Sequence, residues 1–155
     1  MSKIEISRVT IQTHGHATED LDKVKQSILN IVPQSLRDRI AIEHEVVKGY
    51  YGNIINRLKV SLEGNDAVES VKYLLSIMSE GDKLSLINTI DIRYNKKSNE
   101  IYIRLSKQDA YLGFATLYDG DDAIKVVITF AYKKSLSDVK KLIEGLVKGS
   151  TANAI

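Results

Sequence analysis

The sequence predicts a single α+β domain in which helices pack on one largely antiparallel or mixed sheet. Segments with alternating apolar residues, typical of half-buried strands, outnumber segments with helical spacing. Most of these strand-like segments follow one another through short polar turns, which favours hairpins over parallel crossovers. The length of 155 residues, with 43% hydrophobic and 27% charged residues, suits one globular domain. We expect that domain over residues 1–149 and a flexible tail over 150–155.

The composition excludes several kinds of protein. There is no cysteine, which excludes disulfides, thiolate metal sites and cysteine nucleophiles. The N-terminus lacks the apolar stretch of a secretory signal, and no window approaches 18 uninterrupted apolar residues, so we expect a cytoplasmic protein with no membrane partner. The net charge of only +2 is too small for coating nucleic acid by charge alone, so any such site must be local.

The first elements are a strand and a helix. A strand over 4–13 changes its apolar phase near Ser7 and Arg8, which predicts a bulge there. Thr18 is the expected N-cap of the following helix, because two acidic residues come directly after it. Pro33 is the expected end of that helix, since the residue before a proline avoids the α conformation.

The middle of the chain alternates strands with polar turns and helical stretches. In order, we expect a helical turn over 34–39, a strand over 40–46, a loop over 49–55, a strand over 58–62, and a helix capped by Asn65 and ended by Gly81.

The last part of the chain is richer in strands. We first expect a short helical piece over 83–87, a strand over 90–94, a turn over 95–99 and a strand over 101–106. A helical turn over 107–112, stopped by Gly113, then precedes a strand over 114–118, an acidic turn over 119–122 and a strand over 123–132. The last element is a helix from Ser135 to Gly149, with Asp138 completing a capping box.

One hairpin of this pattern has chemistry suited to binding. Strand 101–106 alternates buried isoleucine and leucine with outward Tyr102 and Arg104, and the preceding strand 90–94 adds Arg93 to the same outer face. Interleaved basic and aromatic residues on an open sheet suit base stacking combined with phosphate contact. The same pattern also occurs on ordinary solvated sheet faces.

The turn that follows this hairpin carries more polar and aromatic groups. Lys107 and Tyr111 lie at i and i+4 on one side of the expected helical turn, with Gln108 beside them. In the structural alternative, Lys107, Gln108 and Asp109 cap a turn, and Tyr111 is a buried hydroxyl donor that fixes the strand order. In the loop 49–55, Tyr50 and Tyr51 offer a stacking platform for bases; alternatively, one ring packs under the turn while the other covers an edge.

Metal binding and catalysis have little support in the sequence. His14 and His16 form a His-x-His pair near acidic residues, but His44 is the sole other histidine that could complete a metal site. His44 fits an edge or satisfied core position better than the role of a catalytic base. The acidic turn 119–122 resembles a fragment of a calcium loop without its bidentate glutamate. No nucleophile elbow, phosphate loop or zinc signature is present. We therefore expect a protein that is not an enzyme and uses no metal or cofactor.

Three blocks of sequence resemble the signature blocks of an archaeal RNA-binding, predicted exosome-subunit family. They are His16-Ala-Thr-Glu-Asp20, Gly49-Tyr-Tyr-Gly-Asn53 and Leu105-Ser-Lys-Gln-Asp-Ala-Tyr-Leu-Gly113. The resemblance implies a fold similar to that of the large-subunit ribosomal protein that binds 5S RNA, and a role near the exosome or in ribosomal RNA processing. Two positions depart from the family pattern: Ile54 stands where a proline is usual, and Ser106 where an aspartate is usual.

The leading hypothesis is a non-enzymatic RNA-binding accessory protein, with exosome-associated or ribosome-associated proteins as further partners. The proposed RNA-binding residues are Arg104, Lys107 and Arg93 for phosphates, Tyr50, Tyr51, Tyr102 and Tyr111 for stacking, and Gln108 for a base edge or sugar. A second hypothesis is a protein interaction or assembly module, in which the same surface binds a partner or a second copy of the chain. A weaker third is a small metal-dependent hydrolase.

Overall fold

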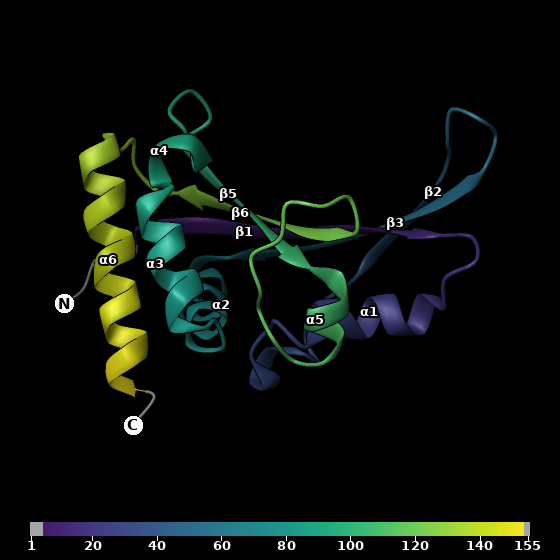
Figure 1. Cartoon of the computed structure of the whole chain (residues 1–155), viewed down its shortest axis with the longest axis horizontal. Helices are drawn as coiled ribbons and strands as arrows, with labels where there is room; N and C mark the ends of the chain where they lie inside the picture. The colour runs from purple at the N-terminus through teal and green to yellow at the C-terminus, as the bar shows by residue number, and fades with distance from the viewer. Residues whose placement is uncertain (1–4, 154–155) are drawn as a thin grey trace.

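A six-stranded antiparallel sheet organises the molecule, which a computed structural model describes over residues 5–153 (Figure 1). The strand order is β2-β3-β1-β6-β5-β4, and every neighbouring pair is antiparallel. The strands are β1 (Ile6–His16), β2 (Glu43–Lys48), β3 (Ile54–Glu63), β4 (Tyr94–Asn95), β5 (Glu100–Ser106) and β6 (Ala123–Phe130).

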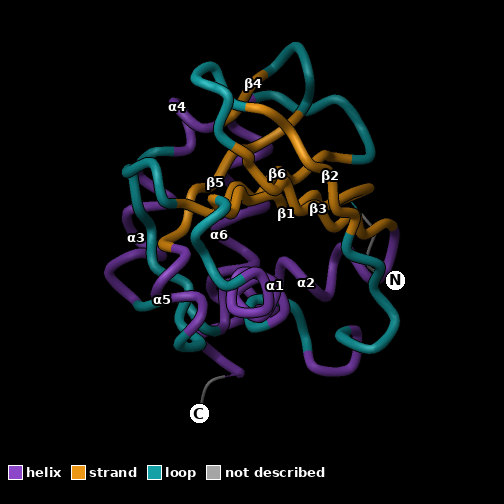
Figure 2. Tube along the Cα trace, turned by 90° about the vertical axis from the view of Figure 1, so that its right-hand side faces the viewer, coloured by secondary structure: helices purple, strands orange, loops and turns teal. Residues whose placement is uncertain are grey.

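The helices leave one face of the sheet uncovered. They are α1 (Leu21–Leu29), the 3₁₀ turn η1 (Gln34–Leu36), α2 (Gly64–Ser76), α3 (Glu80–Asn88), α4 (Ile90–Arg93), α5 (Lys107–Tyr111) and α6 (Leu136–Asn153). Figures 1 and 2 show α1, α2 and α5 together on one side of the strands, and Figure 1 shows α6 upright beside α3 at one end of the sheet. Within residues 5–153, no helix crosses the opposite face of β1, β3 and β6 (Figure 2).

The core lies between the sheet and the helix layer, as alternation predicted. In β6, Ile124, Val126, Ile128 and Phe130 are buried, whereas Lys125 between them is exposed. The predicted bulge is confirmed, because the pairing of β1 with β6 shifts register between Ile6 and Arg8. One antiparallel sheet with helices on one side confirms the predicted α+β class. No described helix is both long enough and apolar enough to cross a lipid bilayer.

Several helix ends differ from the expectation. Asp20, not Thr18, caps α1, because its side chain accepts a hydrogen bond from the Asp22 amide. This helix ends at Leu29, before Pro33 is reached. The second helix begins at Gly64, whose φ of 58° allows a sharp turn out of β3, so Asn65 lies inside the helix. Gly81 is within α3 and does not end α2, which stops at Ser76.

The prediction of a strand over 90–94 is wrong for most of its residues. Residues 90–93 form the single helical turn α4, in which the Ile92 and Arg93 amides donate to the Thr89 carbonyl. The Arg93 guanidinium also donates to the Thr89 hydroxyl at 2.7 Å, which holds the turn. Only Tyr94 and Asn95 extend as β4, and they form the predicted hairpin with β5.

Two more expectations near the C-terminus need correction. Residues 114–118 form no strand and make only isolated bridges, such as that between Ala115 and Met78. The last helix does not stop at Gly149 but continues to Asn153, so most of the expected tail is helical, and residues 154–155 lie outside the described range. The predicted capping box is confirmed: the Asp138 amide donates to the Ser135 hydroxyl, and the Ser135 amide donates to the Asp138 carboxylate.

Candidate functional site

The strand registers align a row of polar side chains across the uncovered face of the sheet. Arg104 of β5 lies opposite Lys125 of β6, Lys125 lies opposite Gln12 of β1, and Gln12 lies opposite Lys59 of β3. Directly opposed residues of antiparallel strands point to the same face. We call Arg104, Lys125 and Lys59 the basic row. Three strand spacings of about 4.8 Å give it a length of roughly 14 Å.

No carboxylate lies within ion-pair distance of the basic row in the described part of the chain, although Glu43 of β2 is paired opposite Lys59 at its end. Among the described residues, its three cations make no ion pair. Arg104 donates to the neutral Gly120 carbonyl at 2.7 Å, and the Lys125 ammonium lies 5.0 Å from the centroid of the Tyr102 ring. Other cations of the same face are paired with acids, as Arg57 is with Glu45 at 3.4 Å. The row therefore presents a local positive charge in a protein of small net charge.

Aromatic groups lie beside the row and beyond it. Tyr102 is on the same face as Arg104, two residues earlier in β5, and its hydroxyl donates to Glu100 at 3.0 Å. Tyr50 and Tyr51 are at the tip of the β2–β3 hairpin, which projects from the body of the molecule (Figure 1). They are 95% and 92% exposed, and their rings meet edge to face at 5.1 Å. Neither ring packs under the turn.

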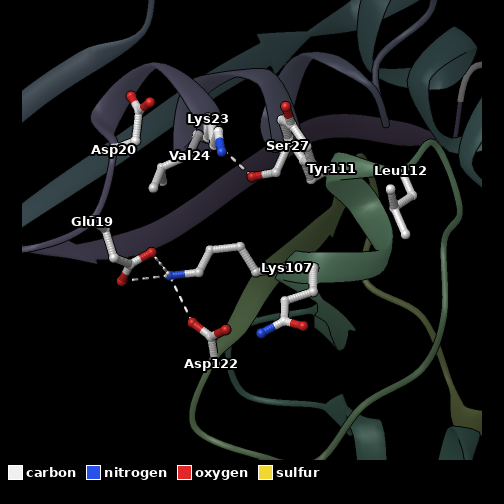
Figure 3. Close-up of a pocket in the computed structure, with 10 residues that line it drawn as sticks. Glu19, Asp20, Lys23, Val24, Ser27, Lys107, Tyr111, Leu112 and Asp122 are labelled. Carbon is white, nitrogen blue, oxygen red and sulfur yellow. Dashed lines mark hydrogen bonds and ion pairs between the residues drawn. The ribbon is translucent and has the colours of Figure 1, made fainter.

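Lys107 is buried and fully engaged. Its ammonium lies 2.7 Å from Asp122 Oδ1 and 3.0 Å from Glu19 Oε2, and it donates to the His14 carbonyl at 2.7 Å. Figure 3 shows the Lys107 side chain running from α5 to a point between the two carboxylates. The sequence suggested Lys107 as a phosphate contact. With only 6% of the residue exposed, however, Lys107 does not offer its charge to a ligand at the surface. It instead joins the β1–α1 loop, α5 and the acidic turn.

Two hollows adjoin this ion-pair cluster. The first, about 460 Å³, lies between α1 and α5 and is lined by Lys23, Val24, Gln108, Tyr111 and Leu112, together with Glu19 and Asp122 (Figure 3). The second, about 590 Å³, shares Glu19, Gln108 and Asp122 with the first and adds His14 and His16. The predicted i, i+4 relation is confirmed, because Lys107 and Tyr111 line the same hollow.

The structure thus divides the sequence-predicted residues among several places. Arg104 and Tyr102 share the uncovered face, Gln108 and Tyr111 line the first hollow, and Tyr50 and Tyr51 form the hairpin tip. Arg93 is in α4, bonded to Thr89, and does not join the outer face of β5. Sequence reasoning missed Lys125 and the acidic partners of Lys107. Alternation along strand 123–132 carried the signal for Lys125, whereas nothing local linked Lys107 to Glu19, which is 88 positions away.

The histidines and acidic residues do not assemble a metal site. No group of three or more potential metal-ligating side chains occurs in the part of the chain that the structure describes. His44 is on the exposed edge strand β2, where it shares a hydrogen bond of 2.8 Å with Asn56. Partial burial lowers the pKa of His14, and the nearby charges of Arg57 and Lys107 lower it further. His14 therefore favours its neutral form near pH 7.

Comparison with known proteins identifies the family to which the chain belongs. A family model described as RNA binding matches residues 8–130, which is most of the chain. The chain belongs to this RNA-binding family. The family is described by what it binds and not by a reaction it catalyses.

Proteins of several archaea resemble the chain over most of its length. An uncharacterized protein of Methanocaldococcus jannaschii is 36% identical over 128 residues, covering 81% of this chain and 85% of that protein. An RNA-binding protein of Pyrococcus abyssi is 28% identical over 151 residues, covering 92% and 97%. The crystal structure of a protein from Archaeoglobus fulgidus superposes with a TM-score of 0.76 at 28% identity, covering 92% and 99%.

Proposed function

We propose that this protein is a non-enzymatic RNA-binding accessory protein and that the uncovered sheet face, centred on the basic row, is where RNA lies. The unpaired state of Arg104, Lys125 and Lys59 is the observation that carries the proposal. A cation already paired with a carboxylate gains little from a phosphate, whereas an unpaired cation gains a full charge-assisted contact and releases a counterion.

Aromatic rings next to these cations favour single-stranded RNA. Unstacked bases stack on tyrosine, and that contact tolerates any sequence because each base has a π face. Tyr102 adjoins the row, and the highly exposed Tyr50 and Tyr51 extend the surface at the hairpin tip. An α-helix is absent from the described part of this face, which also suits a flexible strand lying across a sheet.

The biological setting we propose is the archaeal exosome or ribosomal RNA processing. The support for this part is the resemblance of three sequence blocks to a predicted exosome-subunit family, and the RNA-binding family to which the chain belongs. In that setting the protein would hold RNA for other proteins to process. A role restricted to protein assembly is the competing function, and exposed tyrosine and arginine at the same surface would serve it equally well.

Fluorescence anisotropy across a salt series tests the proposal. The probe is a labelled single-stranded RNA, and the variant carries Lys59→Gln, Arg104→Gln and Lys125→Gln. A matched control removes three exposed lysines of α6 by Lys140→Gln, Lys141→Gln and Lys148→Gln. Loss of three phosphate contacts should reduce the slope of log K against log salt by about 2, since each contact on a single strand contributes about 0.7.

The two variants carry the same change in net charge, so their comparison separates a local site from a general charge effect. An equal loss of RNA affinity in both variants would contradict a site on the uncovered face. If the wild type binds no RNA even at low salt, the RNA-binding proposal fails, and a protein partner becomes the function to test. Circular dichroism melting of each variant controls for loss of fold.

A further inference from the structure

We infer that the hollow between α1 and α5 receives a single unstacked nucleobase of the bound RNA, and that it favours bases carrying an exocyclic amino group over uracil. This inference rests on the RNA-binding function proposed above. We call this hollow the base pocket. Three features of it carry the inference: an apolar wall with an aromatic ring, a polar edge that contains a carboxylate and an amide, and a position continuous with the uncovered face.

The base pocket has the size and wall of a small-molecule site. Its volume of about 460 Å³ falls within the range of roughly 300–1,000 Å³ that ligand pockets occupy. Val24 from α1 contributes an apolar side chain, and Tyr111 and Leu112 contribute two more from the end of α5. Leu112 is 67% exposed although it is apolar, which leaves a surface that a planar ligand can cover.

Tyr111 offers a ring for stacking. It is 41% exposed, and its side chain makes no hydrogen bond among the described residues, so the hydroxyl does not tie the ring to the protein core. The Lys23 ammonium lies 5.9 Å from the ring centroid, where it can also meet a phosphate attached to the stacked nucleoside. The ring can therefore stack on the base of a nucleotide while the cation contacts its phosphate.

The polar edge of the base pocket selects hydrogen-bond donors. Asp122 uses Oδ1 to hold Lys107, and its Oδ2 has no partner within the described range. The Gln108 side chain is exposed and makes no hydrogen bond to any described residue. Carboxylates accept from the amino group of cytosine, and glutamine pairs with the amino group and ring nitrogen of adenine. Uracil has no amino group, and a uracil carbonyl oxygen turned toward the Asp122 carboxylate is repelled, so the carboxylate is the group that disfavours uracil.

The walls of the base pocket are held in place without a ligand. The Asn30 side chain, just after α1, donates to the carbonyls of Ala110 and Tyr111 at 3.1 and 2.8 Å. Lys107 of α5 also pairs with Glu19, which lies in the loop just before α1. Because these contacts fix α1 against α5, little ordering free energy is lost when a base enters.

The base pocket also continues toward the uncovered face. The second hollow shares Glu19, Gln108 and Asp122 with it and reaches His14. In turn, His14 lies opposite Arg57 in the pairing of β1 with β3, one alternate position from Lys59 of the basic row. An RNA strand lying on the row can therefore turn one nucleotide past His14 into the base pocket.

The test measures the affinity of eight-nucleotide adenylate, cytidylate and uridylate RNAs for the wild type and the variants Tyr111→Leu, Tyr111→Phe and Gln108→Ala. Tyr111→Leu keeps an apolar side chain but removes the ring, and should lower the affinity for adenylate and cytidylate RNA about tenfold. Tyr111→Phe keeps the ring and should bind as the wild type does. Gln108→Ala should reduce the preference for adenylate over uridylate RNA.

A second measurement does not require any variant to fold. Addition of adenosine or uridine monophosphate to ¹⁵N-labelled wild type should shift the amide signals of Gln108 and Leu112, and adenosine monophosphate should do so at lower concentration. If Tyr111→Leu binds all three RNAs normally and neither nucleotide shifts those amides, the base pocket is refuted while RNA binding on the basic row stands. If the wild type binds no RNA, the proposed function itself fails.

Discussion

Lys107 shows how one buried charge can hold three chain segments. Its ammonium meets the carboxylates of Glu19 and Asp122, and the His14 carbonyl accepts a further hydrogen bond. A buried ammonium without such partners would be costly, so the three segments are ordered together or not at all. Both carboxylates keep part of their surface in water, with 30% and 41% of the side chains exposed.

We predict that Lys107→Met lowers the free energy of unfolding by about 2 kcal/mol. Breaking a fully buried pair costs roughly 3–5 kcal/mol, and the partial exposure of Glu19 and Asp122 reduces that cost. Urea denaturation at pH 7 measures it. Lys125→Met makes the same chemical change on the exposed basic row and is the control, with an expected change within about 0.5 kcal/mol.

The same two variants separate structure from RNA contact. Lys107→Met should keep most of the RNA affinity that Lys125→Met loses, because the Lys107 ammonium is already occupied. The reverse result, with a stable Lys107→Met protein that no longer binds RNA, would show that Lys107 reaches the ligand directly.

His14 should make the stability depend on pH in the acidic range. Partial burial lowers its pKa below the ordinary value of about 6.5, and Arg57 and Lys107 add to the effect. The unfolded chain therefore takes up the proton first as the pH falls, so folding loses free energy from about pH 6.5 downward through the folded pKa. We predict that His14→Gln loses less stability than the wild type between pH 7.5 and pH 5, as measured by urea denaturation.

Salt provides the control for the His14 prediction. In 1 M sodium chloride the charges of Arg57 and Lys107 are screened, so the difference between wild type and His14→Gln should shrink but not vanish, because burial is insensitive to salt. Identical pH profiles for the two proteins at low salt would contradict the prediction.

At the scale of elements, the β2–β3 hairpin combines an ordered turn with exposed side chains. The Gly49 amide donates to the Asn53 carbonyl at 2.7 Å, and Gly52 takes a φ of 81°, which favours glycine. Ile54, found where the family pattern has proline, begins β3 and pairs with Lys48. The turn therefore needs neither tyrosine for its own geometry.

We predict that the double substitution Tyr50→Ala, Tyr51→Ala leaves stability within about 0.5 kcal/mol of wild type, because both rings are almost fully exposed. The double substitution should lower the affinity for single-stranded RNA at least fivefold, since stacking contributes about 1–3 kcal/mol per base. Thermal melting and anisotropy measure the two effects. Tyr132→Ala, an exposed tyrosine after β6, is the control, and equal binding loss there would contradict a role for the hairpin tip.

At the scale of the whole molecule, the sheet is strong in its centre and weak at one edge. β1 is paired on both sides, with β3 and β6, and contributes buried residues such as Val9 and Ile11 to the core. The edge strand β2 pairs only with β3 among the described strands, and nearly all its side chains are exposed. Local opening should therefore begin at β2.

Hydrogen exchange measured by NMR tests this order of stability. We predict that amides in β1 and β6 exchange roughly a hundredfold or more slowly than those in β2. Amides of α6 serve as an internal reference from outside the sheet. Equal exchange rates in β1 and β2 would show that the hairpin opens only with the entire domain. Slowing of β2 when RNA is added would place that hairpin in the bound surface.

Much of this architecture was predictable because it depends on local patterns. Period-two alternation located the strands around Ile11, Val60, Ile103 and Val126, all of which are buried. The β4–β5 hairpin, the α5 turn and the Ser135–Asp138 cap follow from residues only a few positions apart. For the same reason, Arg104 and Tyr102 were identified as neighbours on one outward face.

The wrong predictions involve competition between local preferences and packing. Ile90 and Ile92 alternate like strand residues, yet a helical turn buries Ile90 and leaves Ile92 78% exposed. Gly81 resembles a helix terminator, but it lies in the first turn of α3, whose N-cap is Ser79. In each case the local pattern permits two conformations, and contacts with other elements select one.

The sequence alone determined that this chain forms an α+β domain with strands in hairpins, and that basic and aromatic residues stand outward on one of them. The tertiary structure decided which of those residues act together. Registers among β5, β6, β1 and β3 align the basic row, and Lys107 meets Glu19 across 88 positions. Alternation and capping depend on near neighbours, whereas ion pairing and register depend on how distant segments pack, so only the folded chain shows which charges remain free.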